Sequence, residues 1–112
     1  MEIRNLAKKN VKITNLRGNE VLADLEPCDF KFTTKSGGTR RIDSINGIET
    51  HLHRCGTLKG IPDPEEGVIY VTAVFDTARK ASLMGREDIY HLHVTVEDET
   101  TIYADSIARI TE

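Results

Sequence analysis

Hydrophobic and polar residues alternate along several short stretches of the chain, and this pattern with a period of two predicts β-strands. In Val11–Leu16, Val11 and Ile13 alternate with Lys12 and Thr14, which is typical of a half-buried strand. Residues 20–25 either pair back as a second strand or form an irregular excursion. Further strands are predicted at 29–34, 40–45, 48–54 and 89–98. Residues 101–110 form another strand, or a strand and a short helical turn.

Glycine-containing turns divide these segments. Asn46-Gly47 is the strongest hairpin signal in the chain, because both residues tolerate a positive φ. The Lys35–Thr39 segment predicts another turn, with 40–45 as the hairpin partner of 29–34.

The spacing of the apolar residues changes from that of a strand to that of a helix within residues 60–81. Pro62 and Pro64 favour an extended loop, and the β-branched and aromatic residues at 68–71 then predict a short strand. From that point the apolar residues are spaced as on one face of a helix: Val71, Val74, Phe75, Ala78 and Ala81. We therefore predict a helix over Thr72–Met84, with Thr72 as N-cap, Gly85 just beyond its end, and Val74, Phe75 and Ala78 buried. One long buried strand is the competing interpretation.

These elements predict a single domain over residues 1–112 of the α+β class. Its sheet is expected to be mostly antiparallel, with the one central helix packed on it.

Composition narrows the classes of function. The chain has 112 residues and a formal net charge of −3, which argues against binding to nucleic-acid polymers or anionic membranes. Neither a membrane-spanning apolar run nor a secretory signal is present, so we expect a cytoplasmic protein, in the host cell if a phage encodes it. In that compartment Cys28 and Cys55 are expected to be free thiols, although their number allows a disulfide.

Several motifs resemble a family of short proteins from bacteriophages and prophage-bearing bacteria. That family has an I-x-N-L-T-P-H strand, a Ser-Gly turn before an Arg, and a G-L-P-x-P-x-x-G-x-x-Y-I-V-S block followed by a helix and R-x-D-L. The matching pieces here are ITNL at 13–16, SGGTRR at 36–41, NGIE at 46–49, and KGIPDPEEGVIYVTAVFDTARKA with GREDIY at 59–90. NLTPH is NLRGN in this chain, so Asn19 stands where the family has His, and the serine of YIVS corresponds to Thr72 or Ala73. The resemblance implies a phage context and assigns no catalytic residue.

Basic and aromatic residues form the candidate ligand site. Arg40 and Arg41 follow the Ser-Gly turn, whose amides can hold an anion, and arginine binds phosphate bidentately. A tyrosine beside such cations can stack on a nucleobase. We predict ligand-binding roles for Arg40, Arg41, Arg79, Arg86, Tyr70 and Tyr90. The alternatives are ordinary surface charge, pairing of Arg86 with Asp88 or Glu87, and tyrosines buried in the core.

Two pairs of histidines have a spacing of i and i+2, which puts both members of a pair on one face of a strand: His51 with His53, and His91 with His93. If the two strands lie side by side, the four imidazoles could bind a metal. No acidic residue at a familiar metal spacing accompanies them, so we expect no metal and no cofactor.

No G-x-S-x-G, P-loop or C-x-x-C motif is present, which favours a non-enzymatic protein. The leading hypothesis is an oligomeric phage or prophage accessory protein that sequesters a small anionic nucleotide signal of host antiviral defence. The alternatives are a structural or host-protein interaction module without a small ligand, and a His-ligated metal enzyme. In a chain this short we expect the ligand site at the interface of a homo-oligomer.

Overall fold

The computed structural model describes residues 1–28, 33–35, 38–53 and 57–111. Ten strands and one helix lie in these ranges. They follow the chain in the order β1 (Glu2–Asn5), β2 (Asn10–Thr14), β3 (Val21–Leu25), β4 (Thr33–Lys35), β5 (Thr39–Ile45), β6 (Ile48–His53), β7 (Thr57–Lys59), β8 (Val68–Thr72), α1 (Phe75–Leu83), β9 (Ile89–Glu97) and β10 (Thr101–Arg109). Of the strand predicted at 29–34, residues 29–32 lie outside the described residues, and Thr33 and Thr34 belong to β4.

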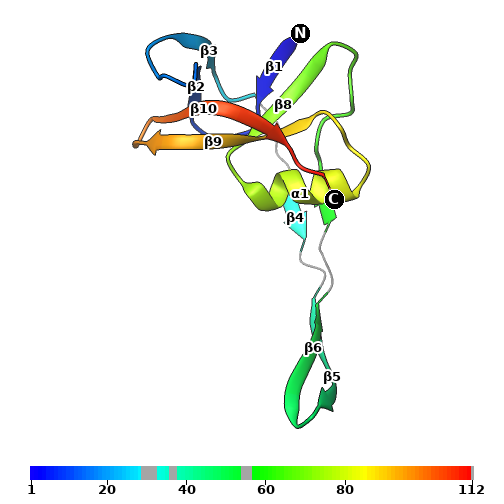
Figure 1. The fold of residues 1–112 in the computed structure, drawn as a ribbon. Coiled ribbons are helices and arrows are strands. Elements are labelled where there is room, and N and C mark those ends of the chain that lie inside the picture. The colour runs from blue at the N-terminus through cyan, green and yellow to red at the C-terminus, as the bar shows by residue number, and fades with distance from the viewer. Residues whose placement is uncertain (29–32, 36–37, 54–56, 112) are drawn as a thin grey trace.

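Six strands form the main sheet, in the order β1-β8-β9-β10-β2-β3 (Figure 1). The α+β class is confirmed, but the prediction of a mostly antiparallel sheet is wrong. β1 pairs with β8, β8 with β9, and β10 with β2 in parallel, whereas β9–β10 and β2–β3 are antiparallel. The reason is that α1 acts as a crossover connection, which brings β9 beside β8 in the same direction.

The sheet curls toward closure through Asn5. This residue forms a parallel bridge with Pro27, and its carbonyl accepts a 2.9 Å hydrogen bond from the Cys28 amide. The buried Asn5 side chain donates to the carbonyls of Lys9 and Leu25 at 2.8 and 3.2 Å. It thereby positions the connection between β1 and β2 and gives the sheet a partly barrel-like form.

The predicted change from strand to helix is confirmed, but the helix is shorter than predicted. Thr72 is the last residue of β8 and not an N-cap; its hydroxyl accepts a hydrogen bond from the Val74 amide at 3.1 Å. At the other end Gly85, with φ +84°, and Arg86 donate to the Ser82 and Ala81 carbonyls, a Schellman arrangement. No helix in the described ranges is long and apolar enough to cross a membrane.

The buried face of α1 is also displaced from the predicted one. Thr77, Ala78 and Ala81 are buried, whereas Val74 and Phe75 are 55% and 53% exposed. Val74 precedes the helix, and a rotation of about 100° per residue puts Phe75 beyond the edge of the buried arc. The Phe75 ring instead makes an edge contact with His91, at 5.5 Å between centroids.

The core consists of two clusters of buried side chains. One contains Leu6, Leu58, Val68, Tyr70, Ala81 and Ile89. The other contains Val11, Ile13, Val71, Leu92, Ile102 and Ala104. Adjacent residues of β8 contribute to both clusters, so this strand is buried on both of its faces, as parallel strands usually are.

An arm extends from this body. It consists of the hairpin of β5 and β6, and the short β4–β7 pair lies between it and the body (Figure 1). Asn46 and Gly47 have φ values of +49° and +78°, which confirms the predicted turn. The predicted pairing of 40–45 with 29–34 is wrong, because β5 pairs with β6 and β4 with β7. The arm explains the elongated shape, 55 × 29 × 26 Å.

Candidate functional site

The six predicted ligand-binding residues occupy different parts of the chain. Arg40 and Arg41 lie on β5, at exposed positions of the arm. Arg79 is exposed on α1, and Tyr90 is half-buried on β9, against the second core cluster. Figure 1 shows the arm extending beyond the body, so one protomer does not gather these residues into one site. The roles of Arg40, Arg41, Arg79 and Tyr90 stay predictions.

Arg86 has a structural partner. Its Nε and Nη2 atoms each donate a 2.8 Å hydrogen bond to the Asp88 carboxylate, and this pairing raises the pKa of Arg86. The structure shows the alternative interpretation, an internal ion pair with Asp88, and the ligand-binding role of Arg86 stays a prediction.

Tyr70 is completely buried in the first core cluster, so its ring offers no face to a nucleobase. Arg4, opposite it on β1, lies over the ring at 5.9 Å and donates a 3.4 Å hydrogen bond to its hydroxyl. Arg4 itself pairs with Glu2 and Glu65 at 3.1 and 2.7 Å, and the hydrogen bond to Glu2 raises its pKa. Tyr70 is therefore a core residue with a satisfied hydroxyl, and its predicted stacking role is wrong.

The two histidine pairs belong to different sheets. His51 and His53 lie on β6 in the arm, and His91 and His93 lie on β9 in the body. Within one protomer the two strands are not neighbours, and the described residues contain no group of three or more potential metal ligands. That the histidines bind no metal stays a prediction.

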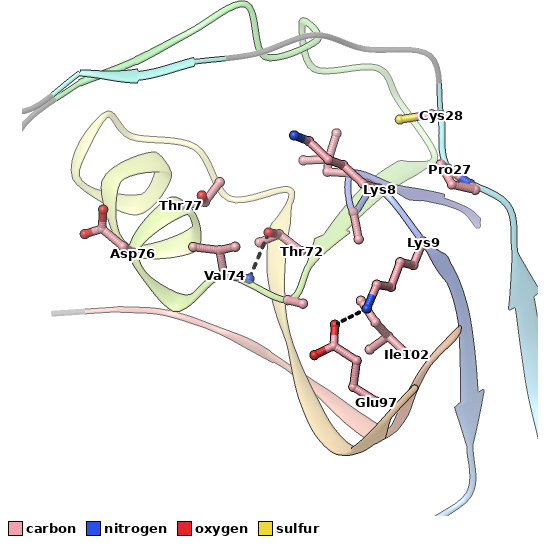
Figure 2. Close-up of a pocket in the computed structure, with 13 residues that line it drawn as sticks. Lys8, Lys9, Pro27, Cys28, Thr72, Val74, Asp76, Thr77, Glu97 and Ile102 are labelled. Carbon is pink, nitrogen blue, oxygen red and sulfur yellow. Dashed lines mark hydrogen bonds and ion pairs between the residues drawn. The ribbon is translucent and has the colours of Figure 1, made fainter. Parts of the chain in front are cut away.

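A groove of about 820 Å³ lies where β8 leads into α1 (Figure 2). Its walls come from the β1–β2 connection, the residues after β3, the start of α1, the end of β9 and the start of β10. The lining residues are Leu6, Ala7, Lys8, Lys9, Pro27, Cys28, Thr72, Ala73, Val74, Asp76, Thr77, Glu97 and Ile102. The carboxyl ends of the parallel strands β1 and β8 both point to this place, where α/β sheets commonly bind ligands.

Most charges of the groove are neutralised by neighbours. Lys9 pairs with Glu97 at 3.4 Å, and Asp76 pairs with Lys80 at 2.9 Å and points away from Lys8 in Figure 2. Lys8 is exposed and makes no side-chain hydrogen bond or ion pair with the part of the chain that the structure describes. Within the described ranges, Lys8 therefore gives the groove a positive charge that no neighbour neutralises.

Two further groups provide hydrogen-bond donors. The first amides of α1 have no intrahelical acceptor, and the N-cap residue Val74 provides no side-chain hydrogen bond to them. The Thr77 side chain lines the groove and makes no hydrogen bond within the described ranges, although Thr77 is only 2% exposed. No fully buried side-chain polar atom lacks a partner there, so the Thr77 hydroxyl keeps a small opening to the groove.

The sequence patterns did not single out Lys8 or Thr77. The one signal that pointed here was the change from strand to helix after residue 71, because a helix that follows a parallel strand presents its N-terminus at the edge of the sheet. Cys28 also lines the groove as a free thiol, and Cys55 lies outside the described residues.

Comparison of the chain with protein-family models, with curated proteins and with solved structures found no match.

Proposed function

We propose that this protein is a non-enzymatic binding protein whose groove at the start of α1 holds a small molecule with an apolar body and one anionic group. The observation that carries the proposal is the Thr77 hydroxyl, which is almost fully buried beside an uncapped helix N-terminus and has no hydrogen-bond partner among the described residues. Anions are favoured at such a terminus because the helix dipole and free amides both face them. Lys8 supplies a full positive charge at the mouth of the same groove.

The dimensions and lining of the groove support a nucleotide as the class of ligand. Small-molecule sites usually enclose about 300–1,000 Å³ and combine apolar walls with a few polar groups. The groove, at about 820 Å³, has mainly apolar walls from Leu6, Val74 and Ile102. A base or ribose would occupy the apolar part, and a phosphate would lie between Lys8 and the start of α1.

The wider role, sequestration of a nucleotide signal of host antiviral defence, rests on the resemblance to phage proteins. A protein with that role binds its ligand tightly and releases it unchanged.

The first test is a thermal-shift screen of the wild type against cyclic di- and trinucleotides and cyclic ADP-ribose isomers, followed by calorimetric titration. A ligand present at 100 times its dissociation constant stabilises the native state by about 2.7 kcal/mol, which the screen resolves easily. The nucleoside of each hit, which lacks the phosphate, serves as the matched ligand control. If none of these nucleotides stabilises the protein, the proposal is wrong.

Variants then locate the site. Lys8→Gln removes the free charge and Thr77→Val removes the hydroxyl at nearly constant volume, so each should weaken nucleotide binding roughly tenfold. Lys59→Gln is the matched control, because Lys59 is also exposed, lies on β7 outside the groove and makes no ion pair with the described residues. Equal binding by the Lys8 and Lys59 variants would place the ligand elsewhere.

A further inference from the structure

Asn46 and Gly47, which form the turn at the tip of the arm, are open to water. Both residues are exposed, and a Cβ placed on Gly47 would meet no atom within 4 Å. Within the part of the chain that the structure describes, no hydrogen bond holds the Asn46 side chain or the Gly47 amide. The tip of the arm therefore leaves a side-chain amide and the main-chain amide that follows it free to react.

An asparagine that precedes a glycine reacts with its own main chain. The Gly47 nitrogen, after loss of its proton, attacks Cγ of Asn46. A bond forms between these two atoms, the bond from Cγ to the side-chain nitrogen breaks, and that nitrogen takes up a proton from solvent and leaves as ammonia. Water then opens the resulting five-membered imide at one of its two carbonyl carbons, which gives aspartate or isoaspartate. Water is the only co-reactant, and no atom is oxidised or reduced.

The residue after the asparagine decides how easily this attack occurs. Glycine has no Cβ, so the nitrogen of Gly47 is accessible, whereas any other side chain at this position crowds the approach to Cγ. Asn19 is also exposed, but Glu20 follows it, and its side-chain oxygen accepts a 2.7 Å hydrogen bond from Asn15. None of the other four asparagines precedes a glycine: Asn5, Asn10, Asn15 and Asn19.

The turn has to open before the imide ring can close. The ring includes the Cα–C bond of Asn46, so closure fixes the ψ of this residue at a value that differs from that of a turn with two positive φ values. The pairing next to the turn is irregular between Ile42 and Ile45, and Ile45 and Ile48 are 59% and 67% exposed. Because an isolated two-stranded hairpin is marginally stable at best in water, opening at the tip costs little.

We propose that Asn46 is a self-modification site whose isoaspartate product opens the arm. An isoaspartate carries the main chain through Cβ and thereby adds one methylene to the turn. A two-residue turn does not accommodate this addition, so the pairing of Ile45 with Ile48 is lost. The reaction also adds one negative charge to the formal net charge of −3. The inference does not depend on the ligand groove, which lies in the body.

The first test follows the purified wild-type protein during incubation in mildly alkaline buffer, with digestion at acid pH and tandem mass spectrometry. The peptide that contains Asn46 should gain about 1 Da, the difference between an amide and a carboxyl group. The rate should rise with pH, because the attacking nitrogen has to lose its proton. Peptides that contain Asn15 and Asn19 are internal controls and should keep their mass. A wild-type protein in which Asn46 reacts no faster than Asn19 overturns the proposal.

Gly47→Asn is the matched variant for the attacking residue. Asparagine tolerates the left-handed region, so the turn is retained, but its Cβ crowds the nitrogen of residue 47. The gain of mass at Asn46 should slow roughly tenfold, which corresponds to about 1.4 kcal/mol in the barrier. The same slowing is expected if the substitution opens the turn, because the Cβ is present in either state. A variant that reacts as fast as the wild type contradicts the role of Gly47 and overturns the proposal.

The second test measures amide hydrogen exchange in the purified isoaspartate form. The amides of Ile45 and Ile48 should exchange faster than in the fresh protein, whereas the amides of β9 and β10 should be unchanged. Asn46→Asp carries the same new charge on a normal main chain and should keep the protection of the fresh wild type. Equal exchange in the isoaspartate form and in Asn46→Asp would overturn the inference that the modification opens the arm.

Discussion

Arg86 holds Asp88 through two hydrogen bonds of 2.8 Å, one to each carboxylate oxygen. The two side chains are only 15% and 16% exposed. The Asp88 carbonyl also accepts a 2.8 Å hydrogen bond from the Tyr70 amide of β8. The pair therefore secures the turn between α1 and β9 against the sheet.

We expect Arg86→Ala to destabilise the protein and not to act on a ligand site. It leaves the Asp88 carboxylate largely buried without its partner, which should lower the free energy of unfolding by about 1.5–3 kcal/mol. Arg86→Lys should be intermediate, because an ammonium cannot form the bidentate pair. Urea unfolding measures both, with Arg79→Ala, an exposed cation on α1, as the control. Equal stability of the Arg86→Ala and Arg79→Ala variants would refute this role.

The observed exposure of Phe75 predicts a smaller loss of stability on its truncation than the apolar periodicity of the helix suggests. Phe75→Ala should cost only about 0.5–1.5 kcal/mol, the value of its edge contact with His91, and not the loss expected of a buried ring. Ala81→Leu should cost more, about 1–3 kcal/mol, because Ala81 is completely buried where α1 meets the sheet. Chemical denaturation of the two variants measures which one loses more unfolding free energy. A larger loss for Phe75→Ala than for Ala81→Leu would contradict this packing.

Local sequence signals predicted the elements better than their partners. The Asn46-Gly47 turn and the strand-to-helix change after residue 71 both appear in the structure, because each depends on residues close in sequence. The parallel pairing of β1 with β8 joins residues more than 60 positions apart, and no local pattern encodes it. β1 itself was not predicted, since a four-residue edge strand carries too little alternation to be recognised.

The same limit applies to the candidate site. The pairing of Arg86 with Asp88 was foreseen as an alternative, since the two residues are two positions apart. Lys8 and Thr77 meet at one groove only because β1 lies beside β8 and α1 follows β8. Such a site depends on the tertiary fold. Basic residues that are chosen by residue type alone are as often members of ion pairs or surface charges as they are ligand-binding residues.

Gly85 should be required for the end of α1. Its φ of +84° suits glycine, and a Cβ placed there meets no atom within 4 Å, so the cost of Gly85→Ala is one of backbone conformation. We expect a loss of about 1 kcal/mol in the free energy of unfolding. Gly85→Asn should cost less, because asparagine tolerates the left-handed region. Thermal unfolding distinguishes the two, and equal losses would argue against backbone conformation as the cause.

Asp105 should make stability depend on pH in the acid range. His93 Nδ1 lies 2.6 Å from its carboxylate, and the hydrogen bond from His93, with a further one from Ser106, lowers the pKa of Asp105. A carboxyl group whose pKa is lower in the native state stabilises that state at pH values above its unfolded pKa. This stabilisation is lost as the pH falls through the lower native value. Asp105→Asn removes the titrating group and should melt below the wild type at pH 7.

The difference in melting temperature between wild type and Asp105→Asn should persist down to about pH 5 and begin to shrink as the pH falls below about 4, the ordinary range of an aspartate; it should disappear only below the lower native pKa. Asp43→Asn is the matched control, since Asp43 is exposed and makes no ion pair with the described residues. Its difference from the wild type should be small and should not follow this profile. A difference for Asp105→Asn that stays constant from neutral to acid pH would show that the substitution acts through packing, and that the hydrogen bond to His93 contributes no charge-dependent stability.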